Sequence, residues 1–156
     1  MTAAPDERHL RRTLELARLA RERGNHPFGA LLADARGSVV EAENTLVTDT
    51  DWTGHAELNA VRAAGAALGL VDLGTYTLYA STEPCAVCTS AAYWAGVGRI
   101  VFALGAETFR ELAGIGDDGG KLALSCRDVL SRGGRSVAVS GPHLEDEAWA
   151  VHDGFW

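Results

Sequence analysis

The chain has 156 residues, of which 47% are hydrophobic, and a formal net charge of −7 at pH 7, so we expect residues 1–156 to form a single domain. No apolar run is long enough to span a bilayer, and the acidic balance counts against a large nucleic-acid partner without excluding a local basic patch. Three cysteines without a disulfide pattern, and charged residues soon after Met1, predict a cytoplasmic protein without a signal peptide.

The first half of the chain contains two helical patterns and a hairpin. Apolar residues recur at helical spacing between Asp6 and Arg23, which predicts an amphipathic helix. Two β-rich segments, 28–33 and 38–42, are separated by turn residues and predict a β-hairpin. After a polar loop, segment 55–68 carries apolar residues along one face and predicts a second helix.

The second half alternates strands and helices. We expect strands at 76–80, 99–103 and 136–139, and helices at 85–95, 122–130 and 145–152. The resulting order is a hairpin followed by β-α-β units. It predicts a three-layer α/β/α fold with a central mixed five-stranded sheet.

Two short strings carry the strongest chemical signal, His55-Ala56-Glu57 and Pro84-Cys85-Ala86-Val87-Cys88. One imidazole and two thiolates suit Zn²⁺, and three protein ligands leave the open position of a catalytic zinc site. Glu57 is poorly placed to be a fourth ligand. We expect its carboxylate to move protons to and from a water that zinc activates.

Both strings fall at the expected N-termini of helices. Two helix starts at one end of a sheet would bring His55 close to Cys85 and Cys88 despite their separation in sequence. The first-turn amides and the helix dipole favour negative charge, so we expect the pKa of both thiols to be lowered. Pro84 suits a first-turn position, where its missing N–H costs little.

Other interpretations of these residues are structural. His55 could be a core histidine, and the C-x-x-C pair could be a redox centre or half of a structural zinc knuckle. A redox pair leaves Glu57 and Pro84 unexplained. A knuckle needs a fourth Cys or His, and the remaining cysteine, Cys126, lies far downstream. These points favour the catalytic zinc site.

The combined pattern H-x-E…P-C-x-x-C resembles that of the zinc nucleobase deaminases. The chain is identified as a member of the cytidine deaminase-like superfamily and is similar to bacterial guanine deaminases from about residue 25 to residue 118. The resemblance also includes Asn25-His26-Pro27-Phe28-Gly29-Ala30, Asn44, Ser81-Thr82-Glu83 and Ala92-Tyr93-Trp94-Ala95. The Tyr-Trp pair resembles guanine deaminases, whereas tRNA adenosine deaminases usually have His-Ala there.

The resemblance implies roles for individual residues. The zinc ligands would be His55, Cys85 and Cys88, with Glu57 as the catalytic proton carrier. The substrate-binding residues would be Asn44, Phe28, Trp94 and Asp118. Each of these four also has a structural interpretation, as a core aromatic or a turn residue. The resemblance further implies a homodimer.

These observations predict a zinc-dependent hydrolase that removes an exocyclic amino group from a small heterocycle, with guanine as the favoured substrate. Cytosine, guanosine and cytidine are alternatives, and tRNA adenosine fits the charge and the Tyr-Trp pair less well. From a different class, the chain could be an inactive zinc-stabilised binding protein or a partner subunit of a heteromeric editing enzyme. Glu57 argues against an inactive site, because a structural zinc has no use for it.

The aromatic pair Phe155-Trp156 has no role in these motifs. Exposed aromatic side chains often dock on another surface. The pair could be a lid over the pocket, a contact with a neighbouring subunit or a hydrophobic anchor.

Overall fold

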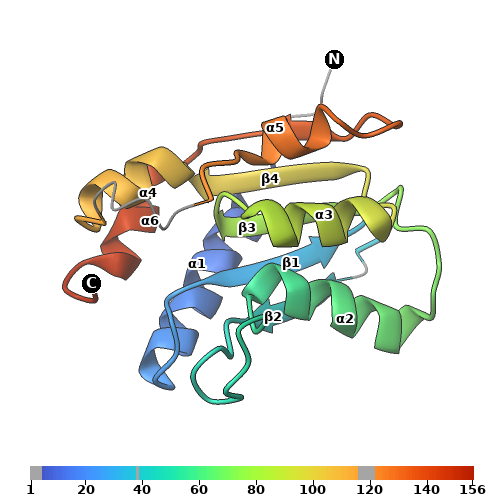
Figure 1. Cartoon of the computed structure of the whole chain (residues 1–156). Coiled ribbons are helices and arrows are strands. Elements are labelled where there is room, and N and C mark those ends of the chain that lie inside the picture. Colours follow the sequence, from blue (N-terminus) through green and yellow to red (C-terminus); the bar gives the residue numbers. More distant parts are fainter. Residues whose placement is uncertain (1–4, 38, 116–121) are drawn as a thin grey trace.

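The computed structural model describes residues 5–37, 39–115 and 122–156, which form a central sheet with helices on both faces (Figure 1). The helices are α1 (Glu7–Glu22), α2 (Ala56–Leu68), α3 (Ala86–Trp94), α4 (Ala106–Leu112), α5 (Cys126–Leu130) and α6 (Glu145–His152). The strands are β1 (Gly29–Ala33), β2 (Val39–Glu43), β3 (Thr77–Thr82), β4 (Arg99–Leu104) and β5 (Ala138–Ser140).

The sheet has the order β2-β1-β3-β4-β5 and is mixed. Strand β1 pairs antiparallel with both β2 and β3, whereas β3, β4 and β5 are parallel to one another. The parallel strands are joined by helical crossovers, as the β-α-β pattern requires. The expected three-layer α/β/α fold with a mixed five-stranded sheet is confirmed.

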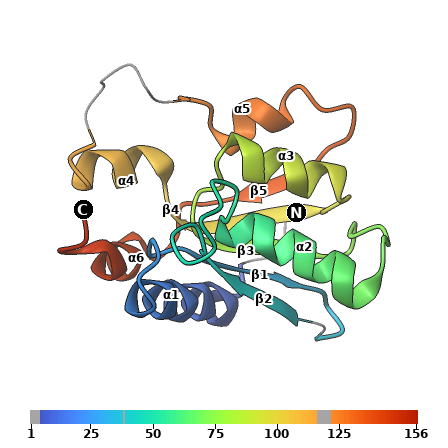
Figure 2. The same ribbon diagram turned by 60° about the horizontal axis from the view of Figure 1, so that its bottom comes forward.

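The helices divide between the two faces of the sheet, as Figure 2 shows from a second side. Helices α2, α3 and α5 cover one face, over a core that includes Leu78 and Phe102. Helices α1 and α6 cover the other face, over a core that includes Leu10 and Val101. Because both faces are covered, every residue of the inner strand β1 is buried, whereas the edge strand β2 stays partly exposed.

Helix α1 shows how the local sequence produces these elements. Its N-cap, Asp6, accepts a hydrogen bond from the backbone N–H of Arg8. Leu10, Leu14 and Ala17 recur at helical spacing and are buried against the sheet. Among the described residues, no helix is both long and apolar enough to cross a membrane.

One helix was not expected, and two expectations about helix starts were wrong. Helix α4 was not expected, because none of its residues is fully buried and its apolar pattern is correspondingly weak. Helix α5 begins at Cys126, not at 122, because Ser125 and Asp128 form a capping box there. Pro84 precedes α3 instead of lying in its first turn, because Cys85 is the N-cap.

Candidate metal centre

Two helix N-termini bring the candidate ligands together. His55 is the N-cap of α2 and Cys85 is the N-cap of α3, and both have extended backbone conformations. Neither side chain caps its own helix, so the imidazole and the thiol are free to face each other. Cys88 lies one turn into α3, on the same side as Cys85. Helices α2 and α3 lie on the same face of the sheet, which places these ends side by side (Figure 1).

The three ligand atoms have the spacing that a tetrahedral zinc requires. His55 Nδ1 lies 3.5 Å from Cys85 Sγ and 3.4 Å from Cys88 Sγ, and the two sulfurs are 3.6 Å apart. Normal Zn–S and Zn–N bonds in a tetrahedron separate two sulfurs by about 3.8 Å, and a sulfur from a nitrogen by about 3.6 Å. The group is therefore a metal site of zinc dimensions.

The two thiols of this group differ in acidity. The pKa of Cys85 is lowered to about 4, chiefly by the hydrogen bond from Cys88 and by the neighbouring His55. The same hydrogen bond and burial raise the pKa of Cys88. The expectation that both thiols would have a lowered pKa was wrong for Cys88, because adjacent sulfurs share one proton. A cation between the sulfurs would favour the thiolate form of both.

Glu57 lies beside the metal ligands and is almost completely buried, with 7% of its surface exposed. Its Oε2 is 3.5 Å from Cys88 Sγ. Burial, together with the negative charge of Cys85, raises the pKa of this carboxyl to about 7. A carboxyl with a pKa near neutrality can both accept and return a proton, which is what general acid–base chemistry needs.

A cavity of about 430 Å³ opens beside these residues. Its volume lies in the range of small-molecule sites. It is lined by His26, Phe28, Asn44, Leu46, His55, Glu57, Thr82, Glu83, Pro84, Cys85, Ala106, Phe109, Arg110, Ile115, Leu122 and Leu124. The lining combines apolar walls with a few polar groups around the metal site, and so suits a flat, partly polar ligand.

The structure places two of the four expected substrate-binding residues in this cavity. Asn44 is buried at the end of β2, and its Oδ1 accepts a hydrogen bond from the backbone N–H of Leu46. Its Nδ2 makes no hydrogen bond to another described residue, so this amide can donate to a ligand. Phe28, which precedes β1, contributes an aromatic wall and packs edge-on against Phe109.

The other two expected residues are not in the described cavity. Trp94 is 84% exposed and lies at the C-terminal end of α3. It lies nine positions after Cys85, about 14 Å along the helix axis, and is not among the residues that line the cavity, so its contact with the base stays a prediction. Asp118 lies outside the described residues.

Several residues of the cavity were not expected from the sequence. Phe109 and Arg110 belong to α4, a helix that was not expected because its apolar pattern is weak. Thr82 and Glu83 immediately precede Pro84 and Cys85, and this position next to the metal-binding motif could have predicted that they line the cavity. The Glu83 carboxylate accepts hydrogen bonds from the backbone N–H groups of Ala106 and Cys126, and so ties α4 and α5 to the metal-binding loop.

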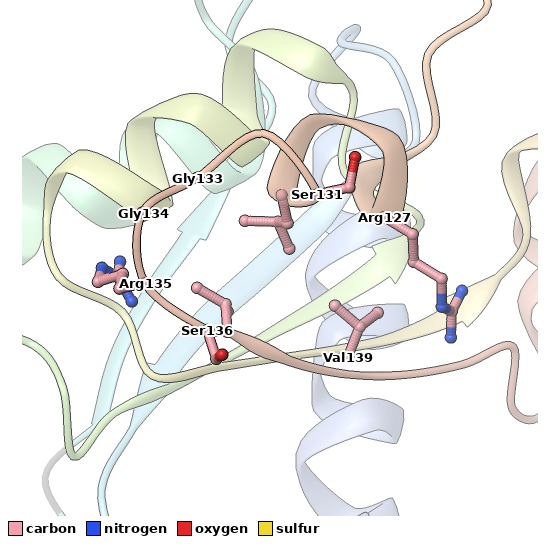
Figure 3. A pocket seen from close by; sticks show the side chains of 9 residues that line it. Arg127, Ser131, Gly133, Gly134, Arg135, Ser136 and Val139 are labelled. Atoms are coloured by element: carbon pink, nitrogen blue, oxygen red, sulfur yellow. The ribbon is translucent and has the colours of Figure 1, made fainter.

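A second hollow, of about 520 Å³, lies at the edge of the sheet beside α5 and β5 (Figure 3). It is bordered by two arginines that already have partners. Arg127 donates to the carbonyl of Gly141, and Arg135 donates to the carbonyls of Tyr93 and Val97. None of the metal ligands lines this hollow, whereas His55 and Cys85 line the first cavity.

Comparisons with known proteins agree with this site. Residues 3–104 match the family model described as the cytidine and deoxycytidylate deaminase zinc-binding region. A probable cytosine deaminase of Schizosaccharomyces pombe is 37% identical over 156 residues, covering 97% of this chain and 92% of that protein. Guanine deaminase of Bacillus subtilis is 39% identical over 77 residues, which is 49% of each chain. The structure of guanine deaminase from Nitrosomonas europaea superposes with a TM-score of 0.77 at 26% identity, covering 97% of this chain and 84% of that one.

Proposed function

The chain belongs to the cytidine and deoxycytidylate deaminase zinc-binding family, and we propose that it deaminates a free nucleobase, with guanine as the first candidate. Hydrolytic deamination at a zinc site is the chemistry of this family. The observation that carries the proposal is the cavity beside His55, Cys85, Cys88 and Glu57, which combines aromatic walls with a free amide donor.

The residues of the site divide the work of hydrolysis. Zinc held by His55, Cys85 and Cys88 would supply a Lewis acid that makes water acidic enough to lose a proton near neutral pH. Glu57 takes that proton and gives it to a ring nitrogen of the base. It then takes the proton of the hydroxyl group added to the ring carbon and gives it to the amino group, which leaves as ammonia. Its raised pKa of about 7 suits both transfers.

Binding of the base depends on the cavity walls. Phe28 and Phe109 give apolar surfaces against which a planar ring can pack. Asn44 Nδ2 offers a hydrogen bond to a carbonyl oxygen or ring nitrogen of the base. Close burial of the ring would exclude water from the reaction and hold the carbon that bears the amino group near Glu57.

Guanine is proposed first because the sequence strings resemble guanine deaminases and the fold superposes on one over most of its length. Cytosine is the second candidate. It is favoured by the S. pombe relative, whose similarity extends over nearly the whole of both chains. Both bases present an exocyclic amino group next to a ring nitrogen, so the same residues could act on either.

The test is ammonia release by the zinc-loaded protein from guanine, guanosine, cytosine, cytidine, adenine and ammeline. Guanine is expected to react fastest. Guanosine is expected to react poorly, because the proposed substrate is a free base without a sugar. Faster release from cytosine would replace guanine with the second candidate. No release from any of the six compounds, with zinc bound stoichiometrically, would contradict the proposal.

A further inference from the structure

A chain of hydrogen bonds leads from Trp156 to the wall of the substrate cavity. The indole Nε1–H of Trp156 donates to His152 Nδ1 at 3.2 Å. On the other side of the same imidazole, His152 Nε2 lies 3.5 Å from Thr82 Oγ1. Thr82 is the last residue of β3 and lines the cavity. His152, the last residue of α6, and Trp156, four residues later, are thus connected to the Thr82 hydroxyl at the site.

The direction of these hydrogen bonds follows from the donor chemistry of the indole. Indole nitrogen can only donate, so His152 Nδ1 must accept and cannot carry a proton. A neutral imidazole then carries its proton on Nε2 and donates it to Thr82 Oγ1. Burial lowers the pKa of His152 to about 4, so the ring is neutral near pH 7.

The surroundings of His152 hold this arrangement in place. The imidazole has 1% of its surface exposed and is enclosed by the rings of Phe28, Phe109, Trp149 and Trp156. Trp149 stacks on it at 5.8 Å, and Phe28 and Phe109 separate it from the ligand space that they line. The chain after α6 runs back toward α4 (Figure 2). The ring centroids of Trp156 and Phe109 are 5.3 Å apart.

The hydrogen of the Thr82 hydroxyl is not used in its contact with His152. Because its oxygen accepts the proton of His152 Nε2, its own hydrogen must point elsewhere. No other hydrogen bond joins this oxygen to a residue in the described part of the chain. The hydroxyl can therefore donate a hydrogen bond to a ligand in the cavity.

We infer that Thr82 donates a hydrogen bond to an acceptor atom of the bound base, a carbonyl oxygen or a ring nitrogen, and that His152 and Trp156 are positioning residues that fix this polarity. The inference rests on the proposed function, since it concerns the base bound for deamination. Thr82 would select bases with an acceptor at that point over bases with an amino group there, because two donors cannot pair.

Steady-state kinetics of the zinc-loaded protein with guanine and with cytosine test this contact. In Thr82→Val, KM is expected to rise about two- to tenfold with little change in kcat, as for the loss of one neutral hydrogen bond. Thr82→Ser keeps the hydroxyl and should restore KM. An unchanged KM in Thr82→Val for whichever base is turned over would overturn the contact.

The positioning role is tested by Trp156→Phe, which keeps an aromatic ring but removes the N–H. Without that donor, the imidazole can protonate at Nδ1 and take the hydrogen of Thr82, so KM should rise as in Thr82→Val. The double variant Thr82→Val/Trp156→Phe should be no worse than Thr82→Val alone. The matched control is Trp149→Phe, which alters the stacking on His152 without touching the hydrogen bonds. Additive effects in the double variant would show that Trp156 acts only by packing.

NMR of the imidazole nitrogens gives a readout that does not depend on turnover. The unmodified chain at pH 7 should show His152 protonated at Nε2, and Trp156→Phe should shift it toward the Nδ1–H form. Protonation at Nδ1 in the unmodified chain would overturn the hydrogen-bond chain. Absence of turnover with the expected nitrogen signals would instead contradict the proposed function and the substrate contact, and leave the hydrogen-bond chain established.

Discussion

At the scale of single residues, the site depends on one carboxyl group, Glu57, whose surroundings bring its pKa close to neutral pH. Glu57 is buried next to Cys88, and burial alone would favour its protonated form. A bound divalent cation close by would favour the ionised form. These opposing influences make Glu57 suited to a role in which it gains and loses a proton in each reaction cycle.

Replacing this carboxyl separates metal binding from proton transfer. We expect Glu57→Gln to bind zinc with normal stoichiometry and to lose about 10²–10⁴-fold in kcat, because an amide cannot carry the proton. Metal analysis and ammonia release on the same sample measure the two properties. Turnover close to that of the unmodified protein would remove Glu57 from the mechanism.

The lowered pKa of His152 predicts that the folded chain loses stability in acid. Its pKa is about 4 in the folded chain, lowered by burial and by the nearby Arg21, against 6.5 for an ordinary histidine. The unfolded chain therefore binds more protons between these values, and stability is lost as the pH falls from 6.5 toward 4. From pH 7 to pH 4.5 the loss from this residue is about 2–3 kcal/mol.

Urea unfolding at the two pH values measures this loss. His152→Gln lacks the titrating group, so its free energy of unfolding should fall by about 2–3 kcal/mol less than that of the unmodified chain. The difference between the two proteins isolates His152 from the carboxyl groups that titrate over the same range. Equal losses in both would mean that His152 is accessible to protons in the folded state.

At the scale of elements, the position of α1 on the sheet depends on a glycine. Gly29 opens β1, and a Cβ there would meet the carbonyl oxygen of Thr13 and lie 2.6 Å from Leu16 Cβ. Both contacts belong to α1, and one of them is backbone. The helix can approach the strand this closely only because the side chain is missing. The close approach leaves the interior of α1 fully buried at Leu10 and Ala20.

Adding one methyl group at this position is expected to be costly. Gly29→Ala should destabilise the fold by about 1–3 kcal/mol or more, because α1 must shift to relieve the overlap. The matched control is Gly65→Ala inside α2, where the nearest atom to an added Cβ is Leu70 Cδ2 at 4.0 Å. That change should stabilise by about 0.5–1 kcal/mol through helix propensity. Denaturant midpoints of the two variants on opposite sides of the unmodified value are the expected result.

At the scale of the whole molecule, the metal site joins parts of the chain that are distant in sequence. His55 follows the hairpin, whereas Cys85 and Cys88 follow β3, so a bound ion would link α2 to α3. Such a ligand set exists only in the folded chain, and zinc binding therefore adds to folding free energy. A homodimer, a cytoplasmic location and the action of residues 1–156 as one domain stay predictions.

Removal of zinc should lower thermal stability. At a free zinc concentration of one hundred times the Kd, the loss would be about 2.7 kcal/mol, or roughly 5–10 °C in Tm for a chain of this size. Calorimetry with and without a chelator measures the shift. Cys88→Ser should abolish it, whereas Cys126→Ala, at a buried cysteine outside the site, should keep it. A chelator response that survives in Cys88→Ser would place the metal elsewhere.

The metal-binding motif, the adjacent carboxyl and the layered fold could all be predicted from the sequence. His55 and Glu57 are two residues apart, and Cys85 and Cys88 are three apart at a helix start, so their chemistry is written in short-range spacing. The alternation of helical and strand patterns likewise depends on neighbouring residues, and it predicted the mixed sheet. The missed α4 and the shortened α5 depart from this prediction, because burial is weak in the first and a capping box sets the start of the second.

The surroundings of the metal site depend on tertiary packing and could not be predicted from the sequence. Trp94 follows the zinc cysteines in sequence but is carried away along α3, whereas Phe109, His152 and Trp156 come from distant segments and pack together beside the cavity. The Trp156 ring packs against Phe109 and His152, behind the wall of the cavity, and does not itself line the cavity. Contacts of this kind depend on how far each helix extends and on how the layers pack, and neither is encoded in the spacing of a few residues.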